Sequence, residues 1–438
     1  MTRHARTVPP PSLVGLAVFG VFLLVSGLTW GIAAAWETTI ADAGQWAATG
    51  AATTDELASD VSVAQPLADP PEPVPTPEPD AEFTIVAAGD VLPHLPVLRS
   101  ARLADRSYDL TPLLAPVDPW IRGADLALCH LEVPVNPPGV APSGYPLFST
   151  VPAVVQALRD QGWDGCSTAS NHSVDRGFAG VAATLDALDA AGLGHVGTAR
   201  SATEAAQPQL YRLVRGGQTL TVAQISATYA VNGMPVETDK PWSVNRIDVP
   251  TLVAQAVAAR SAGADLVVAS IHCCVEYQSG PSAEQLAIDQ GLAESGQIDV
   301  VLGHHAHVPQ PVAKLAGGPR GEGMWVFYGL GNYLSNQDSD CCSPATDSGL
   351  LAAIHVRKPV DGPASVAALE WTGLTVDRVG KHRVYALPEI TAGAGTLTST
   401  EVARRAARVA TAVGTQAAQR TTPLTPTGPV PTVVARTS

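Results

Sequence analysis

The sequence predicts an α/β fold built on largely parallel, buried strands. Between Phe83 and Thr372, short runs rich in alanine and β-branched residues alternate with longer stretches of helical character. The runs FTIVAAGD, ADLVVASIH and DVVLGHHAH are almost continuously apolar at first, as expected for strands covered on both faces. The stretches VPAVVQALRDQG and GVAATLDALDAAG are long enough for the helices that connect parallel strands.

The chain has 438 residues, and its composition divides it into segments. They are a cytoplasmic N-terminus (1–12), a transmembrane signal-anchor (13–36), a Pro- and acid-rich extracytoplasmic linker (37–82), the main domain (83–375) and a C-terminal extension (376–438). The net charge of −14 excludes nucleic acid as a partner on this interpretation, because nonspecific nucleic-acid binding depends on basic patches.

Residues 13–36 form a nearly unbroken apolar run without a charge, and about 20 such residues span a bilayer core. Arginines precede the run and acidic residues follow it, which by the positive-inside rule leaves the N-terminus in the cytoplasm. A cleaved signal peptide is the alternative, since the small residues 33–35 suit cleavage, but its apolar core normally spans only about 7–15 residues. We therefore expect a single-pass protein of the cell membrane with an extracytoplasmic main domain.

The segments on either side of the main domain differ from it in composition. Ala64–Asp80 intersperses prolines with acids, which favours an extended polyproline II stalk. A capping box from Thr398 to Glu401 predicts the start of a helix in the C-terminal extension. The Pro- and Thr-rich residues after Arg420 predict a disordered tail.

Five apolar runs of the main domain end in side chains that bind metal ions. These side chains are Asp90, Glu132, Asn171 with His172, His272, and His305 with His307. Sites in open α/β sheets form outside the carboxyl ends of the strands, so we expect these groups to meet at one edge of a sheet. Mixed carboxylate, carboxamide and imidazole ligands suit zinc, manganese or iron, and a carboxylate can bridge two ions. The sequence therefore predicts a divalent metal centre with two ions.

Three histidines fall within four positions in LGHHAH. In an extended segment alternate side chains point the same way, so His305 and His307 are expected to converge. Two metal ions about 3.5–4 Å apart activate water and stabilise the attacking and leaving oxygens of a displacement. We therefore expect hydrolysis, most naturally of a phosphoester. The chain contains neither a Gly-x-Ser-x-Gly nucleophile elbow nor a Walker loop.

Taken in order, the motifs resemble those of the poly-γ-glutamate capsule synthesis (CapA-type) family, itself similar to calcineurin-like metallophosphoesterases: GDVLPH, HLE, SNH, HCCVEY, GHHAHVPQ and GLGNYL. The similarity covers roughly Phe83 to Thr372, and the ordered set is far more specific than any one motif. The resemblance implies a four-layer α/β/β/α sandwich. It places Asp90 as the bridging ligand, His307 at one metal, and Asn171, His272 and His305 at the other.

Two positions depart from the metallophosphoesterase pattern. Glu132 stands where those enzymes have a bridging aspartate. Their first motif is Asp-x-His, whereas three residues separate Asp90 from His94, so His94 is expected to reach the metal from the loop.

The resemblance also implies catalytic and substrate contacts. His172 matches the catalytic histidine and is a candidate general acid. Asp175 is expected to orient His172 by a hydrogen bond, or alternatively to lie at a helix N-terminus. Glu276, Tyr277 and Asn332 are candidate substrate-binding residues, with a supporting or turn position as the alternative for Asn332.

The six cysteines comprise two isolated residues and two adjacent pairs: Cys129, Cys166, Cys273-Cys274 and Cys341-Cys342. Disulfides are permitted outside the cell, and a bond between adjacent residues is strained. We therefore expect disulfides across two loops, joining Cys273 or Cys274 to Cys341 or Cys342; free thiols and a thiolate metal site are the alternatives. The isolated cysteines are interpreted as small buried hydrophobes.

The function that these patterns favour is a membrane-anchored, metal-dependent hydrolase of the capsule-synthesis type. Its expected partners are the membrane, an envelope polymer such as poly-γ-glutamate or its precursor, and other capsule-synthesis subunits. A non-catalytic tethering subunit and a metal-independent acid/base enzyme acting on a peptide-like substrate are the alternatives. Metal content separates the first hypothesis from the other two.

Overall fold

The computed structural model of the chain describes residues 79–437. The predicted signal-anchor (13–36) and nearly all of the predicted linker lie outside these residues. Among the residues that are described, no helix combines the length and the apolar character needed to cross a bilayer. All of them fall in one compact unit, so the predicted C-terminal extension is part of the same body as the main domain.

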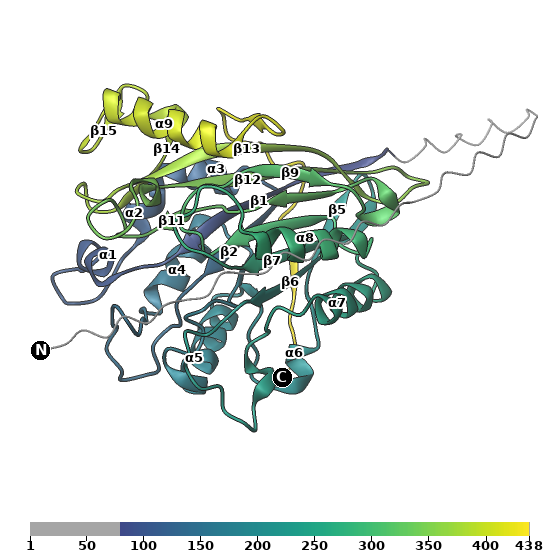
Figure 1. The fold of residues 1–438 in the computed structure, drawn as a ribbon, viewed down its shortest axis with the longest axis horizontal. Coiled ribbons are helices and arrows are strands. Elements are labelled where there is room, and N and C mark those ends of the chain that lie inside the picture. Colours follow the sequence, from purple (N-terminus) through teal and green to yellow (C-terminus); the bar gives the residue numbers. More distant parts are fainter. Residues whose placement is uncertain (1–78, 438) are drawn as a thin grey trace, which may run out of the picture. The chain divides into compact units, whose positions relative to one another are not determined.

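Two mixed β-sheets form the centre of this body (Figure 1). The first sheet has the order β14-β13-β12-β1-β2-β3-β4, with β11 beside β1 and β17 beside β13. Its strands are β1 (Ala81–Val91), β2 (Leu126–Leu131), β3 (Gly165–Ser167), β4 (Gly194–Val196), β11 (Asn332–Leu334), β12 (Ser348–Lys358), β13 (Ser365–Asp377), β14 (Arg383–Ala386) and β17 (Ala418–Gln419). Strands β1 to β4 are parallel. β12 is antiparallel to β1 and β13, and β14 is antiparallel to β13, whereas the short β17 is parallel to β13.

The second sheet has the order β18-β5-β6-β7-β8-β10-β9. Its strands are β5 (Gln209–Arg215), β6 (Gln218–Thr228), β7 (Leu266–His272), β8 (Val300–His304), β9 (Val312–Leu315), β10 (Met324–Phe327) and β18 (Thr432–Val434). The inner strands β6, β7, β8 and β10 are parallel, and the outer strands are antiparallel. A mixed α/β fold is thus confirmed, with parallel strands at the centre of each sheet.

Alternate side chains of β1 divide between two apolar clusters, as the period of a strand requires. Val86 packs under the helices of the first sheet, whereas Ile85 and Ala87 face the second sheet. The helices of the first layer are α1 (Leu95–Ser100), α2 (Thr111–Leu114), α3 (Asp118–Arg122), α4 (Ala153–Gln161) and α5 (Gly177–Ala190). On the other side, α7 (Val249–Ser261) and α8 (Ala283–Glu294) cover the second sheet. Helices, sheet, sheet and helices therefore follow one another.

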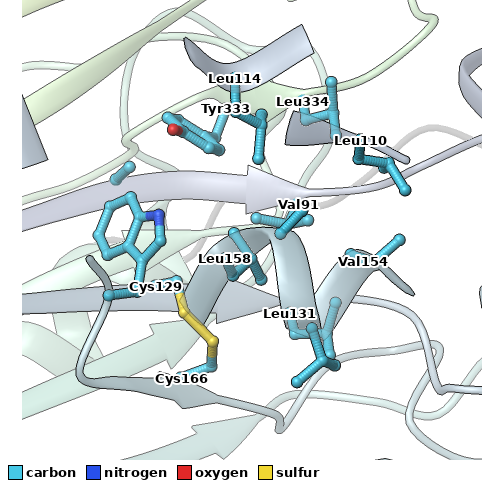
Figure 2. Close-up of a cluster of buried hydrophobic side chains, with 14 of the residues drawn as sticks. Val91, Leu110, Leu114, Cys129, Leu131, Val154, Leu158, Cys166, Tyr333 and Leu334 are labelled. Carbon is cyan, nitrogen blue, oxygen red and sulfur yellow. A yellow bond between two sulfur atoms is a disulfide. The ribbon is translucent and has the colours of Figure 1, made fainter. Parts of the chain in front are cut away.

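The isolated cysteines are buried but not free. Cys129 of β2 and Cys166 of β3 occupy directly paired positions and form a disulfide, with their Cα atoms 4.4 Å apart. Figure 2 shows this bond within the apolar cluster, near Leu131 and Leu158. The prediction that both are buried hydrophobic residues is confirmed. It did not include the disulfide, which depends on which strands the fold makes neighbours.

The helix predicted in the C-terminal extension is confirmed. It is α9 (Ser399–Val413), and the hydroxyl of its N-cap Thr398 accepts a hydrogen bond from the Glu401 N–H at 3.2 Å. Gly414 follows with a φ of +80°, a left-handed conformation that favours glycine and ends the helix. Figure 1 places α9 beside β13 and β14.

The prediction of a disordered tail is wrong for the residues up to Thr437. β18 pairs antiparallel with β5 and so satisfies the edge of the second sheet. Beyond it, the buried guanidinium of Arg436 donates hydrogen bonds to the carbonyl oxygens of His195 and Glu204. The Pro- and Thr-rich composition describes the tail alone, whereas its order comes from backbone partners elsewhere in the fold.

A buried ion pair ties the two sheets to this tail. Arg215 of β5 donates to Asp125 Oδ1 from Nη2 at 2.8 Å, and both side chains are almost fully buried. Asp125 also accepts from the backbone N–H groups of Thr84 and Thr427. One buried carboxylate thus holds β1, β5 and the tail together. Its charge must remain paired, because an unpaired charge is costly when it is buried.

We expect Arg215→Ala to lower the free energy of unfolding by about 3–5 kcal/mol, because it leaves the Asp125 carboxylate buried and unpaired. Arg212→Ala is the matched control, since Arg212 lies exposed on the same strand, and its effect should stay within about 0.5 kcal/mol. Urea denaturation followed by tryptophan fluorescence measures both. Equal stability of the two variants would contradict the role of the pair.

Candidate metal centre

The predicted metal-binding side chains meet where strands from both sheets end. Asp90, Glu132 and Asn171 follow or end β1, β2 and β3 of the first sheet, whereas His272 and His304 end β7 and β8 of the second. The prediction of one sheet edge is therefore corrected to a junction between two edges. Face-to-face packing of the sheets brings both rows of carboxyl ends together.

Two glycines allow the chain to approach this junction closely. A Cβ atom on Gly89 would collide with the carbonyl oxygen of Gly331, and one on Gly303 would collide with that of Tyr328. Each glycine directly precedes a polar residue of the centre, Asp90 or His304. The Gly-Asp and Gly-His pairs in the sequence thus reflect a steric requirement as well as a chemical one.

Asp90 is the point that the potential ligand groups share. It belongs to one group with His130 and His272 and to another with Glu132 and His307, and within each group the ligand atoms lie within 4.8 Å of one another. Its Oδ2 atom lies 3.1 Å from His307 Nδ1, and its Oδ1 atom lies 3.4 Å from His304 Nδ1. A carboxylate shared by two groups has the position of a bridging ligand.

The remaining predicted ligands surround this pair of groups. The Asn171 side-chain oxygen lies 2.9 Å from His272 Nε2. His305 forms a further group with Glu276 and His307, again with ligand atoms within 4.8 Å. All of the predicted ligands except His94 are therefore brought together.

His94 lies apart from these groups. Its Nδ1 atom is 2.9 Å from the carbonyl oxygen of Leu92 and 3.3 Å from the backbone nitrogen of Asn336. Burial lowers the pKa of His94 to about 4, so the ring is neutral at pH 7. With the longer spacing after Asp90, His94 lines a cavity of about 830 Å³ beside the centre instead of joining these groups.

Two histidines that the sequence interpretation missed lie at the centre. His130 Nε2 is 3.0 Å from His272 Nδ1, and the rings of His130 and His304 stack with centroids 4.0 Å apart. His130 precedes Glu132 by two positions and is the register partner of Asp90 on the neighbouring strand. Because alternate residues of a strand point the same way, the position of His130 two residues before Glu132 could have indicated that both side chains face the centre.

Buried polar atoms without partners test whether a metal ion fits here. Among the described residues, these atoms include Asp90 Oδ1, both carboxylate oxygens of Glu132, both ring nitrogens of His304, and His305 Nδ1. Buried polar atoms are rarely left unpaired, so this concentration at one point requires an explanation. A divalent cation of the zinc, manganese or iron type would take oxygen and imidazole donors of this kind. The donor set fits such an ion.

The electrostatics are also those of ligands prepared for a cation. Burial raises the pKa of Glu132 well above its usual range, so an added positive charge would favour the ionised form. Burial lowers the pKa values of His272 and His130 well below their usual range, which keeps both imidazoles neutral and able to coordinate. His307 differs from them: burial opposes its protonation, but Glu132 and Asp90 raise its pKa to about 10, so its proton must leave before the ring can coordinate an ion.

The sequence argument assumes that the backbone of LGHHAH is extended through His305 and His307. The structure shows that it is not. β8 ends at His304, and His305 and His307 have φ values of +81° and +57°. Non-glycine residues in this left-handed region carry a cost of about 1–2 kcal/mol each. Asn232 and Tyr277, which also line the site, have positive φ as well. The two imidazoles therefore converge through a constrained turn.

His172 and Asp175 form a buried pair beside the centre. Asp175 Oδ2 lies 2.7 Å from His172 Nδ1 and accepts a hydrogen bond from the Phe148 N–H, also at 2.7 Å. This geometry favours the orienting role for Asp175 over that of a simple helix-terminal carboxylate. The other nitrogen of His172 remains for a substrate, because His172 lines the cavity above the centre.

That cavity, the first cavity, has a volume of about 830 Å³. Its wall includes His172, His307, Glu276 and Tyr277, which agrees with substrate contact for the last two. Asn332 does not reach it: this residue is buried, and its side-chain oxygen lies 3.0 Å from His307 Nδ1. Asn332 is therefore corrected from a substrate-binding residue to one that positions His307.

The predicted disulfides between the two loops are wrong. Cys273 bonds to Cys274 and Cys341 bonds to Cys342, and no free cysteine is found among the described residues. Cys273 and Cys274 are buried in the apolar cluster beneath α7 and α8, whereas Cys341 and Cys342 lie at the wall of the first cavity. The two pairs thus face different parts of the molecule, which sequence order does not reveal.

The fold and site define a class of protein: two packed mixed sheets with a buried histidine–carboxylate centre at the ends of their parallel strands. The chain belongs to the family of the bacterial capsule synthesis protein PGA_cap, whose model matches residues 84–337. This match includes the strands and loops that carry the centre. It ends before β12, α9 and the tail.

Individual relatives agree with this assignment. The PGA biosynthesis protein CapA of Bacillus subtilis is 26% identical over 217 residues, which cover 49% of this chain and 53% of that protein. The chain thus matches about half the length of that relative. A probable polyglutamine synthesis accessory protein of Mycobacterium tuberculosis is 27% identical over 342 residues, covering 68% of this chain and 86% of the relative.

Solved structures give weaker likenesses. The NAD nucleotidase NadN of Haemophilus influenzae has a TM-score of 0.41 at 11% identity, covering 76% of this chain and 60% of that one. A 5'-nucleotidase precursor of Thermus thermophilus has a TM-score of 0.38 at 14% identity, covering 75% and 58%. Likeness of this size carries no argument about activity.

We expect His307→Ala and His130→Ala to lose most of the bound divalent metal, because each removes an imidazole from a group that contains Asp90. His355→Ala is the control, since His355 pairs with Glu370 on β12 and β13, away from the centre. Elemental analysis of the purified, dialysed variants measures metal per chain. Retention equal to that of the control would refute the ligand assignment.

Proposed function

We propose that this protein is a membrane-anchored, metal-dependent hydrolase that acts outside the cytoplasmic membrane. Its substrate would be an envelope polymer such as poly-γ-glutamate, or a phosphorylated or amide-linked precursor. Membership of the capsule synthesis family supports the polymer, as do the names of the relatives. A single observation carries the proposal of hydrolase activity. Buried oxygen and nitrogen atoms around Asp90 that could bind a metal have no hydrogen-bond partner, and they lie at the base of a cavity of about 830 Å³.

The residues divide into those that would hold metal and those that would act on substrate. Asp90 would bridge two ions, with Glu132 and His307 on one side and His130, His272 and Asn171 on the other. Bound divalent ions would supply Lewis-acid stabilisation of the charge that develops on substrate oxygens. Asn332 would keep the His307 ring in place through its side-chain oxygen.

His172 is the candidate general acid. Asp175 holds its Nδ1 atom and would stabilise the ring when it carries a proton. The Nε2 atom would then deliver that proton to the leaving group of the substrate. Phe148 packs edge-on against the His172 ring, with centroids 4.8 Å apart, which limits its rotation.

Replacement of His172 by Asn tests this role without removing a hydrogen-bonding group beside Asp175. We expect hydrolysis of a generic phosphoester to fall by about 10²–10⁴-fold, with metal content unchanged. The control is His355→Asn, which should leave the rate unaltered. If the metal-loaded wild-type protein shows no turnover of phosphoesters or amides, the hydrolase proposal fails and a tethering role takes its place.

We also infer that residues 13–36 anchor the chain with the N-terminus in the cytoplasm, on the strength of their apolar character and the flanking charges. An alkaline phosphatase domain fused after Ser438 should then be active, because this reporter folds only outside the cytoplasm. A fluorescent protein that needs the cytoplasm, fused at the same place, should stay dark. The reverse pattern would refute the orientation.

A further inference from the structure

A second cavity adjoins the first, with a volume of about 480 Å³. Tyr277 lines both cavities, and the segment that carries Cys341 and Cys342 in the first continues into Ser343 and Ala345 in the second. The far wall of the second cavity is α9, which lies beyond the residues that the family model matches. Tyr277 is therefore a wall that the two cavities share.

The two cavities differ in charge. The lining of the first contains histidines, carboxamides, tyrosines and Glu276, but no lysine or arginine. The lining of the second is largely apolar and contains one cation, Arg408. Of the side chains that line the two cavities, only Arg408 has a guanidinium group. An anionic group of a long substrate would thus meet this guanidinium in the second cavity.

Arg408 lies in a cluster with surplus positive charge. Arg405 and Arg408 both contact the carboxylate of Asp347, while Arg404 and Arg405 both pair with Glu401. Three guanidinium groups thus face two carboxylates, which leaves one positive charge without a balancing anion. Nε and Nη1 of Arg408 are buried without a hydrogen-bond partner among the described residues, whereas Nη2 contacts Asp347 and the side chain as a whole is 23% exposed.

We propose that the second cavity is a subsite for a carboxylate of a linear, acidic polymer whose scissile unit lies at the metal centre. The apolar wall of Pro309, Pro311 and Val409 would pack against the methylene groups of the chain, and Arg408 would bind the carboxylate. The preferred substrate is accordingly an extended oligomer rather than a small phosphoester. This inference rests on the proposed function for the position of the scissile unit.

Equilibrium binding tests the subsite independently of turnover. The probes are fluorescently labelled γ-linked glutamate oligomers of two and of ten residues, and binding to the metal-loaded protein is followed by anisotropy. Wild-type protein should bind the longer oligomer more tightly. Arg408→Gln should weaken binding of the longer oligomer by about tenfold, the size expected for a lost charge-assisted hydrogen bond, and leave the shorter one unchanged.

Arg404→Gln is the matched control, because Arg404 is a more exposed arginine on the same helix that pairs with Glu401 and does not line the cavity. It should bind both oligomers as the wild type does. Arg408→Lys keeps the charge and should retain part of the preference for length, even if Arg408→Gln proves unstable. Thermal unfolding of each variant checks that the domain remains folded.

Equal affinity of wild-type protein and Arg408→Gln for the longer oligomer would overturn the subsite, as would equal losses for both lengths. Competition by inorganic phosphate that depends on Arg408, without any preference for oligomer length, would assign the cavity to phosphate and also overturn it. Binding that depends on length and on Arg408, but without hydrolysis, would uphold the subsite and refute the hydrolase alone.

Discussion

The carboxylate of Asp90 is the constraint on which the arrangement of the site depends. It is fully buried at the junction of the two sheets, and an isolated ionised carboxylate in such a place is very costly. Burial would raise the pKa of Asp90, but the nearby imidazoles of His304 and His307 hold it well below its usual range. The negative charge of Asp90 is thus stabilised by these histidines. Asp90 lies on a strand of the first sheet and His304 ends a strand of the second, so this contact depends on both sheets. This mutual dependence explains why the strand ends of two sheets meet around one residue.

The same dependence explains which parts of the site were predictable. An apolar run that ends in Asp, Asn or His is visible in the sequence, and all five runs do deliver side chains to the junction. Their division between two sheets is a matter of topology, which local patterns do not encode. His130 was missed because it lies within an apolar strand, where its polar partners come from other strands. The left-handed turn at His305 and His307 was missed because tertiary packing overrides the local preference for extended backbone.

The errors in the cysteines and in the tail have one physical origin. Disulfide pairing depends on which Cα atoms the fold brings within reach, and Cys129 and Cys166 become partners only because β2 and β3 are neighbours. The tail has the composition of a disordered segment, but the open edge of β5 and the carbonyl oxygens around Arg436 offer it backbone and side-chain partners. Composition reports how much apolar surface a segment can bury by itself. It does not show whether a distant strand has unpaired backbone groups to which the segment can bind.

These distinctions separate the chemistry of the site from its selectivity. The residues grouped around Asp90 lie within the part of the chain that the family model matches, and they form the centre with little help from the remainder. The second cavity, by contrast, owes its only cation to α9, which packs against the body of the domain through Val402, Val409 and Val413. A helix held in this way can change its cavity-facing residues without disturbing the buried carboxylate, because the two sites share Tyr277 but none of the grouped ligands. The structure thus allows the residues around Asp90 to stay constant while the residues that line the second cavity vary.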